Sequence, residues 1–285
     1  MEKELVALSP VSRDPSKVFA GRPAAAIDRA NAFHTLNFRI PWGHVVGTLH
    51  LDLETRLSTP IAGLPGGMLA KHTTSAASQV VASPRKNLRL AIMMVQYQGL
   101  SPMLKVTGVL DELRDMYPVA EDGVVITQWL GTHTTTRDLS VESNWGELLS
   151  DVAEAAEGWP QSYDVLLALL PGGGTGYARG GIGDAKVQYG WPPPSVAVES
   201  RGETVAHEVG HALGMWHASC PPSGPDAPAA ETVDGTLVTR LEEEGFSVRE
   251  LWVLPRGRGS LMSYCDNGSR WVSIDLWQRL YNRLA

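Results

Sequence analysis

The sequence predicts an α/β domain built around one mixed sheet, and three observations lead to this class. Two apolar runs, residues 88–97 and 163–170, show no alternation, which is typical of strands buried on both faces of a sheet. Segments with apolar residues at helical spacing separate such runs along the chain. The chain has 285 residues, of which 43% are hydrophobic, so one or two domains with a sizeable core are expected.

The first 86 residues differ in composition from the remainder. Residues 46–54 alternate leucines with polar residues, which is typical of a half-buried strand, and with residues 37–41 they suggest a small β unit. Residues 55–87 are rich in Thr, Ser, Ala, Gly and Pro and are predicted to be a linker or long loop. We therefore predict a β-rich N-terminal region over 1–86 and a larger domain over 87–285. Four histidines of the N-terminal half have no ligand spacing and are expected to be structural or exposed: His34, His44, His50 and His72.

A first helix is expected between the strands at 88–97 and 124–130. Ser101 is predicted to cap this helix, with Pro102 at its first position. The Tyr117-Pro118 dipeptide is expected to end it, because proline disfavours helical backbone in the residue before it. Its apolar residues follow helical spacing and should face the sheet: Val106, Val109, Leu110, Leu113 and Met116.

A second helix is expected from Asn144 to about residue 157, before the strand at 163–170. Asn144 and Glu147 have the spacing of an N-cap residue and the third residue of a helix. Its buried face is predicted to consist of four apolar residues: Trp145, Leu148, Leu149 and Val152.

Residues 171–191, PGGGTGYARGGIGDAKVQYGW, contain an unusual density of glycine. Nucleotide binding is not expected, because the stretch lacks a phosphate-loop motif and a following helix. We expect a turn that leads into a strand near 185–189, where glycines allow close backbone approach. Such an edge strand can pair with an extended peptide. A short strand at 196–199 should follow.

The stretch HEVGHALGMWH, which begins at His207, holds three of the eight histidines of the chain. His207 and His211 are four residues apart, so on a helix they share one face, with Cβ atoms roughly 5–6 Å apart. Two imidazoles in this arrangement can bind one zinc ion at about 2.0–2.1 Å. Ordinary core or surface histidines are the competing interpretation. The helix is expected over about 201–213, with Ser200 as N-cap and Glu203 three residues later.

Three further residues of this stretch complete a metal-site hypothesis. Glu208 is rotated by about a quarter turn from His207 on the helix, so it is poorly placed to be a ligand but can reach a water on the metal. Gly214 tolerates positive φ, so it can end the helix and turn the chain back. His217 can then approach the same ion. Three imidazoles and one open position are typical of catalytic zinc.

The HExxHxxGxxH pattern and a downstream SLMSYC stretch at 260–265 resemble the zinc motif and the Met-turn of the metzincin clan of zinc endopeptidases. The resemblance covers about residues 87–285, and within the clan the chain is most similar to secreted bacterial, dictomallein-like members. The long acidic segment between His217 and Met262 departs from the pattern of the clan. Further stretches carry this resemblance: LRLAIMMVQYQG, YPVAEDGVVIT, NWGELLSDV, HASC, MSYC and RWVS.

The resemblance implies a metzincin-like fold and a role for each site residue. Glu208 would act as general base, and Met262 would shape an apolar floor beneath the metal. Tyr264 would ligate resting zinc or stabilise the oxyanion, with a simply packed tyrosine as the alternative. The glycine-rich segment would form the upper rim of the cleft. The implied ligands of Zn²⁺ are His207, His211 and His217.

The resemblance also places the two cysteines of the chain near each other. Cys220 follows the third histidine and Cys265 follows the Met-turn, so a disulfide is expected; two free thiols in a cytosolic protein are the alternative. Ser273 is predicted to cap a final helix over 274–284, which should pack under the Met-turn.

Composition narrows the classes of partner. The net charge of −7 and the pI of about 5.6 argue against nucleic-acid and anionic-membrane partners. No apolar run approaches the ~18 residues that span a bilayer, and no signal peptide is visible. We expect a secreted, monomeric zinc endopeptidase that acts on proteins or peptides, with glycoproteins as a candidate class. Alternatives are a zinc-containing adhesin or carbohydrate-binding module, and an effector or toxin protease acting inside another cell.

Overall fold

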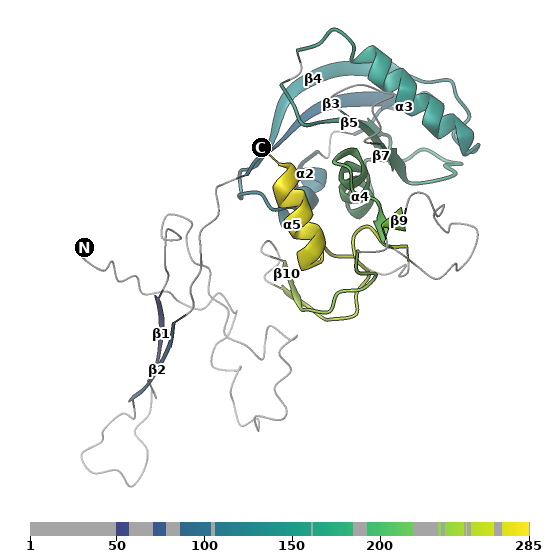
Figure 1. The fold of residues 1–285 in the computed structure, drawn as a ribbon. Helices are drawn as coiled ribbons and strands as arrows, with labels where there is room; N and C mark the ends of the chain where they lie inside the picture. The colour runs from purple at the N-terminus through teal and green to yellow at the C-terminus, as the bar shows by residue number, and fades with distance from the viewer. Residues whose placement is uncertain are drawn as a thin grey trace.

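The computed structural model describes part of the chain, and its described residues form a mixed α/β fold with four helices (Figure 1). One five-stranded sheet lies between helix α3 on one face and helices α2 and α4 on the other, with α5 on the side of α2 and α4. The predicted α/β class with a mostly parallel mixed sheet is confirmed. The described residues are 50–56, 71–77, 86–103, 106–160, 162–184, 193–218, 233–234, 237–247, 249, 252–264 and 270–284.

The sheet has the strand order β4-β3-β5-β7-β6. Four strands run parallel: β3 (Leu88–Gln96), β4 (Val124–Thr134), β5 (Val165–Leu170) and β7 (Pro194–Val198). At the edge, β6 (Gly181–Gly183) pairs with β7 in the antiparallel direction. Every residue of β5 and β7 is buried, which agrees with the continuous apolar runs of the sequence.

Helices cover both faces of this sheet. Helix α3 (Ser143–Ala155) buries the four predicted apolar side chains against one face. Helices α2 (Val106–Met116) and α4 (Gly202–Ala212) pack on the opposite face. Helix α5 (Ile274–Arg283) belongs to the same apolar cluster as α2 and α4, through side chains that include Leu276 and Leu280.

The capping predictions differ in outcome from helix to helix. Ser273 accepts a hydrogen bond from the Leu276 N–H at 3.2 Å, so the predicted cap of α5 is confirmed. The predicted cap of α3 is wrong: its N-cap is Glu142, because the Asn144 amide donates to the Asp138 carbonyl at 2.8 Å. Glu147 pairs instead with Arg137.

The predicted cap of α4 is also wrong. The helix starts within one residue of the expected position, but Arg201 is its N-cap and makes no side-chain capping bond. The Ser200 side chain lies against Gly172 instead, where an added Cβ would approach the Ser200 Oγ to 2.9 Å. Glu203 accepts a hydrogen bond from the backbone of Arg270 rather than completing a capping box.

The predicted start of helix α2 is wrong: Ser101 and Pro102 lie outside the helix, which begins at Val106. The chain before the helix is held in another way, because the backbone N–H of Met103 donates to Glu199 at 2.9 Å. The predicted end of the helix at Tyr117-Pro118 is confirmed. Strand β4 extends four residues beyond the predicted Leu130.

A separate hairpin lies in the N-terminal region. Strand β1 (His50–Arg56) pairs antiparallel with β2 (Lys71–Ala77), so the strand predicted at 46–54 is observed a few residues later. The linker predicted over 55–87 is wrong at β2, whose sequence KHTTSAA has no apolar alternation to reveal it. The division of the chain at residue 86 stays a prediction. Residues 37–41 lie outside the described part of the chain.

Two small two-stranded sheets are formed by residues that come after helix α4 in the sequence. Strand β8 (His217–Ala218) pairs with β9 (Val233–Asp234), and β10 (Gly245–Ser247) pairs with β11 (Trp252–Leu254). The acidic run near residue 243 is only partly solvated, since Glu243 accepts a hydrogen bond from the first N–H of α5. No described helix is both long and apolar enough to cross a membrane.

Candidate metal centre

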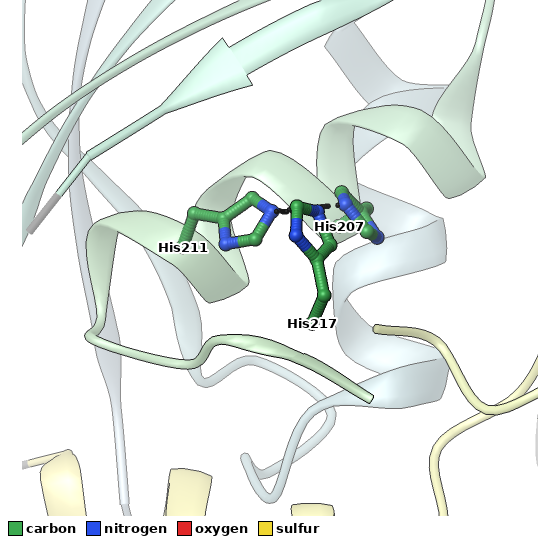
Figure 2. Close-up of side chains that lie close together, drawn as sticks. All are labelled: His207, His211 and His217. Carbon is green, nitrogen blue, oxygen red and sulfur yellow. Dashed lines mark hydrogen bonds between the residues drawn. The ribbon is translucent and has the colours of Figure 1, made fainter. Parts of the chain in front are cut away.

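Three histidine side chains converge at the end of helix α4 (Figure 2). His207 and His211 project from the helix, and His217 projects from β8 after the chain has turned back. The Nε2 atom of His211 lies 3.0 Å from that of His207 and 2.9 Å from that of His217. Their candidate ligand atoms all lie within 4.8 Å of one another, so the three rings can share one metal ion.

Backbone carbonyls orient two of these rings. The Nδ1 atom of His207 lies 2.7 Å from the Leu261 carbonyl oxygen, and that of His211 lies 2.8 Å from the Met215 carbonyl oxygen. With the proton on Nδ1, each ring donates to its carbonyl and directs the Nε2 lone pair toward the shared point. Metal-binding histidines commonly have such a partner for the second nitrogen.

The turn between the helix and His217 has the geometry of a Schellman motif. Gly214 has a φ of +86°, and its N–H donates to the His211 carbonyl at 2.8 Å. The next N–H, of Met215, donates to the Gly210 carbonyl at 2.9 Å. Residues with a side chain rarely adopt this φ. Glycine at position 214 therefore allows the chain to reverse direction between the helix and His217.

The environment favours neutral imidazoles. Burial is the main cause that lowers the pKa of all three rings: that of His207 falls well below its usual value, that of His211 to about 4 and that of His217 to about 3. Mutual repulsion among the rings lowers the pKa of His207 and His217 further. Neutral imidazole is the form that binds metal, so the rings are ready for a ligand role near neutral pH.

Glu208 is buried beside the histidines, at 5% exposure. Burial raises the pKa of its carboxyl to about 8, and the charges of Arg179 and Arg270, together with the Gly183 N–H, act in the opposite direction. A cation held by the histidines would act in the same direction as these arginines. The carboxylate is therefore poised to take up and release a proton.

Strand β6 packs directly against this carboxylate. A Cβ atom added to Gly181 would lie 2.5 Å from the Glu208 Cγ, and one added to Gly183 would lie 2.1 Å from the Glu208 carbonyl oxygen. Both glycines are therefore required for the strand to approach α4. The close backbone approach predicted for this glycine-rich segment is made to the helix. The strand predicted near 185–189 falls on residues outside the described part of the chain and stays a prediction.

Met262 is fully buried beneath α4. A Cβ atom added to Gly210 would meet the Met262 sulfur at 2.8 Å, so this glycine leaves room for the methionine. The Met262 carbonyl accepts a hydrogen bond from the Ala218 N–H at 2.8 Å, next to His217. Together with the Leu261 carbonyl, this turn positions both the helix and β8.

Tyr264 lies beside two of the three rings. Its ring centroid is 4.8 Å from that of His217 and 5.3 Å from that of His207. The guanidinium carbon of Arg270 lies 5.4 Å from the Tyr264 ring centroid, which is a cation–π distance. The tyrosine thus separates the histidine cluster from a cation.

Sequence reasoning predicted close backbone approach in the glycine-rich segment but did not place Gly181 and Gly183 against Glu208, and it missed Gly210 and the two arginines whose charges act on Glu208. A signal existed for β6, since glycines at alternate positions of a strand face the same side. No signal identified Arg179 or Arg270, because their proximity to the site depends on tertiary packing. Cys220 and Cys265 lie outside the described residues, so the predicted disulfide stays a prediction.

No protein-family model matches the sequence, and no curated protein matches it. Among solved structures, the chain is similar to metalloproteinase-II from Bacteroides fragilis, with a TM-score of 0.38 and 14% identity over 71% of this chain. The chain spans about half, 54%, of that protein's length. Archaemetzincin from Methanopyrus kandleri gives a TM-score of 0.34 and 12% identity, covering 69% of this chain and 95% of that chain. Both scores are low, so any functional assignment depends on the site residues themselves.

Proposed function

We propose that the protein is a zinc-dependent endopeptidase. One observation carries the proposal: three histidines hold their candidate ligand atoms within 4.8 Å of one another, and the residue that follows the first of them, Glu208, is buried. A site that only held a metal would have no need of an ionisable carboxylate at this position. The rival adhesin or carbohydrate-binding module is less well supported for this reason.

The donor set fits zinc. Neutral imidazoles are favoured ligands of zinc, and the cluster formed by the described residues supplies three of them. Three protein ligands with one open position are typical of catalytic zinc. When bound, zinc supplies a Lewis acid that lowers the pKa of water toward about 7 and polarises a carbonyl. His207, His211 and His217 would hold it.

Glu208 would act as the general base. Its carboxylate takes the proton of the attacking water and later delivers it to the leaving amine. Its burial supports this role, because a raised pKa makes the protonated form accessible for the second transfer. The Gly183 N–H holds the carboxylate in place.

Tyr264 and Met262 would assist in different ways. The hydroxyl of Tyr264 would act at the metal or at the oxyanion, and the proximity of its ring to those of His207 and His217 supports this role. Met262 would shape the apolar floor under the helix and would do no chemistry. Both roles agree with the resemblance to metzincins.

A disulfide between Cys220 and Cys265 is part of the proposal. The segments that carry these cysteines are joined by the hydrogen bond from the Ala218 N–H to the Met262 carbonyl. Such a bond would tie the segment after His217 to the Met-turn, and it would imply an oxidising compartment outside the cytosol. Free thiols in the purified protein would favour an effector or toxin that acts within another cell.

The experiment is a cleavage assay with metal removal and return. The full chain is incubated with casein and with a mucin-like glycoprotein, before and after chelation, and then with added zinc. We expect fragments that disappear on chelation and return with zinc, at about one zinc per chain. A protein that binds one zinc but cleaves neither substrate would be the adhesin or binding module.

A further inference from the structure

We propose that Arg270 binds a carboxylate of the substrate beside the scissile bond, so that this site selects acidic peptides. The inference rests on the proposed peptidase function, because it assigns a substrate class to the same site. Three features carry it: the position of the guanidinium next to the histidine cluster, its lack of an acidic partner among the described residues, and the distribution of charge around the cluster.

The Arg270 guanidinium is one aromatic ring away from the candidate ligands. It lies over the Tyr264 ring at 5.4 Å, and that ring lies 4.8 Å from the His217 ring. The backbone N–H of Arg270 donates to Glu203, one helical turn before His207, at 3.4 Å. The arginine is therefore anchored to α4 through its backbone while its side chain extends over the tyrosine.

No carboxylate within the described part of the chain forms an ion pair with the Arg270 guanidinium, whose described neighbour is the Tyr264 ring at 5.4 Å. Most other described arginines near carboxylates form ion pairs, such as Arg249 with Glu112 at 3.2 Å. A half-buried guanidinium at a cation–π distance from an aromatic ring retains N–H donors for a carboxylate. A substrate carboxylate would supply the missing partner.

The charges around the cluster are not symmetrical. The Arg270 guanidinium lies on the Tyr264 side of the cluster, where that ring is next to the rings of His207 and His217. On the β6 side, Asp184 follows Gly183, whose Cβ position lies 3.1 Å from the His211 Cβ. Arg179, the other arginine whose charge acts on Glu208, pairs with Glu142. The chain as a whole carries a net charge of −7, so an acidic peptide needs this local positive field to bind.

The first test maps cleavage preference. A mixture of peptides of varied sequence is cleaved by the zinc-loaded full chain and by its Arg270→Gln and Arg270→Glu variants, and mass spectrometry identifies the residues around each cleaved bond. Arg256→Gln and Arg256→Glu are matched controls, since Arg256 is exposed and pairs with Glu244. We expect Asp or Glu to be enriched about tenfold at one position beside the bond in the native and control proteins. Arg270→Gln should remove the enrichment, and Arg270→Glu should replace it with Lys or Arg.

The second test does not depend on activity. Zinc-loaded Glu208→Gln protein and its double variant with Arg270→Gln are immobilised, and retained peptides are identified from two mixtures, one with free and one with amidated C-termini. Acidic peptides should be retained only when Arg270 is present. Retention from the amidated mixture assigns the carboxylate to a side chain, and retention only from the free mixture assigns it to the C-terminus.

The outcomes separate this inference from the proposed function. Cleavage without acidic preference, or an unchanged preference in Arg270→Glu, overturns the inference and leaves the peptidase standing. Absence of all cleavage and of zinc binding overturns the peptidase. If zinc binds but nothing is cleaved, the retention result decides the inference alone. Zinc content and circular dichroism establish that each variant is folded.

Discussion

The two faces of the central sheet bury different kinds of side chain. On the α3 face, the cluster around Trp145 consists of apolar and aromatic residues. On the α4 face, the apolar cluster lies beside His207 and Glu208, which are buried and have pKa values displaced by that burial. Burial of ionisable groups disfavours folding, so proteins retain them mainly where they are used. The comparison teaches that both faces bury apolar side chains, but that only the α4 face also buries the ionisable groups of the site, at a cost in stability.

The largest expected effect is on chemistry at the α4 face. Glu208→Gln keeps the size and burial of the side chain but removes the base, so we expect hydrolysis to fall by roughly 10²–10⁴-fold. Zinc content should be unchanged, because the three histidines are untouched. Stability should not fall, since a buried ionisable group is replaced by a neutral one. Cleavage of casein, metal analysis and urea denaturation measure these quantities; a variant that cleaves at the native rate would refute the mechanism.

A substitution in the apolar cluster on the α3 face should lower the stability of the fold without affecting the metal site. Trp145 is fully buried, and its Nε1 donates to the Leu139 carbonyl at 3.0 Å. Trp145→Ala should lower the free energy of unfolding by about 3–5 kcal/mol through lost packing and an unpaired carbonyl. Zinc affinity of the folded protein should stay within about twofold of native. Trp277→Ala, at a position 39% exposed, is the control and should cost much less. Equal losses would mean that the α3 face is not the stabilising one.

Adding and removing zinc in the native protein should affect the two faces of the sheet differently. Free zinc at a hundredfold excess over its dissociation constant should raise the free energy of unfolding by about 2.7 kcal/mol. The gain in hydrogen-exchange protection should concentrate in α4 and β8, which carry the ligands. Helix α3 should change only through global stability. Similar local protection of α3 and α4 would show that the two faces are coupled through the sheet.

The zinc helix could be predicted closely because its geometry is local. The four-residue spacing of His207 and His211 fixes their common face whatever surrounds the helix, and Gly214 marks the end of the helix in the sequence itself. The cap positions were less predictable, because Ser200 and Asn144 have competing local contacts with Gly172 and Asp138. A spacing rule does not contain such contacts.

The contacts that strand β6 and Arg270 make at the site could not be predicted for a different reason. Glycines have no apolar pattern, and β6 is defined only by pairing with β7 and by its fit against Glu208. Arg270 approaches the site because the chain after the Met-turn passes α4 and reaches Glu203. These placements depend on tertiary packing between distant segments, so residue type and spacing alone do not reveal them.

A substitution in β6 tests the fit between the strand and the site. Gly183→Ala would place a Cβ atom 2.1 Å from the Glu208 carbonyl oxygen and 3.1 Å from the His211 Cβ. We expect a loss of about 1–3 kcal/mol in the free energy of unfolding, with a fall in activity as the strand moves away. Gly173→Ala is a control from the same segment, because no atom lies within 4 Å of its Cβ position. If both variants behave alike, the contact with Glu208 is not what requires glycine.

The smallest effect is expected for a substitution at the start of α5, which tests whether this helix supports the metal site or only the apolar core. Ser273 accepts from the Leu276 N–H at 3.2 Å, so Ser273→Ala removes a helix cap and should cost about 1 kcal/mol of unfolding free energy. Ser150→Ala is the control, since that hydroxyl donates to the Gly146 carbonyl within α3 and caps nothing. Because α5 shares its apolar cluster with Met262 but contributes no ligand, zinc affinity should not change with the cap. A fall in zinc affinity larger than about threefold would show that α5 positions the Met-turn, and the division between a stabilising face and a functional face would then have to include this helix on the functional side.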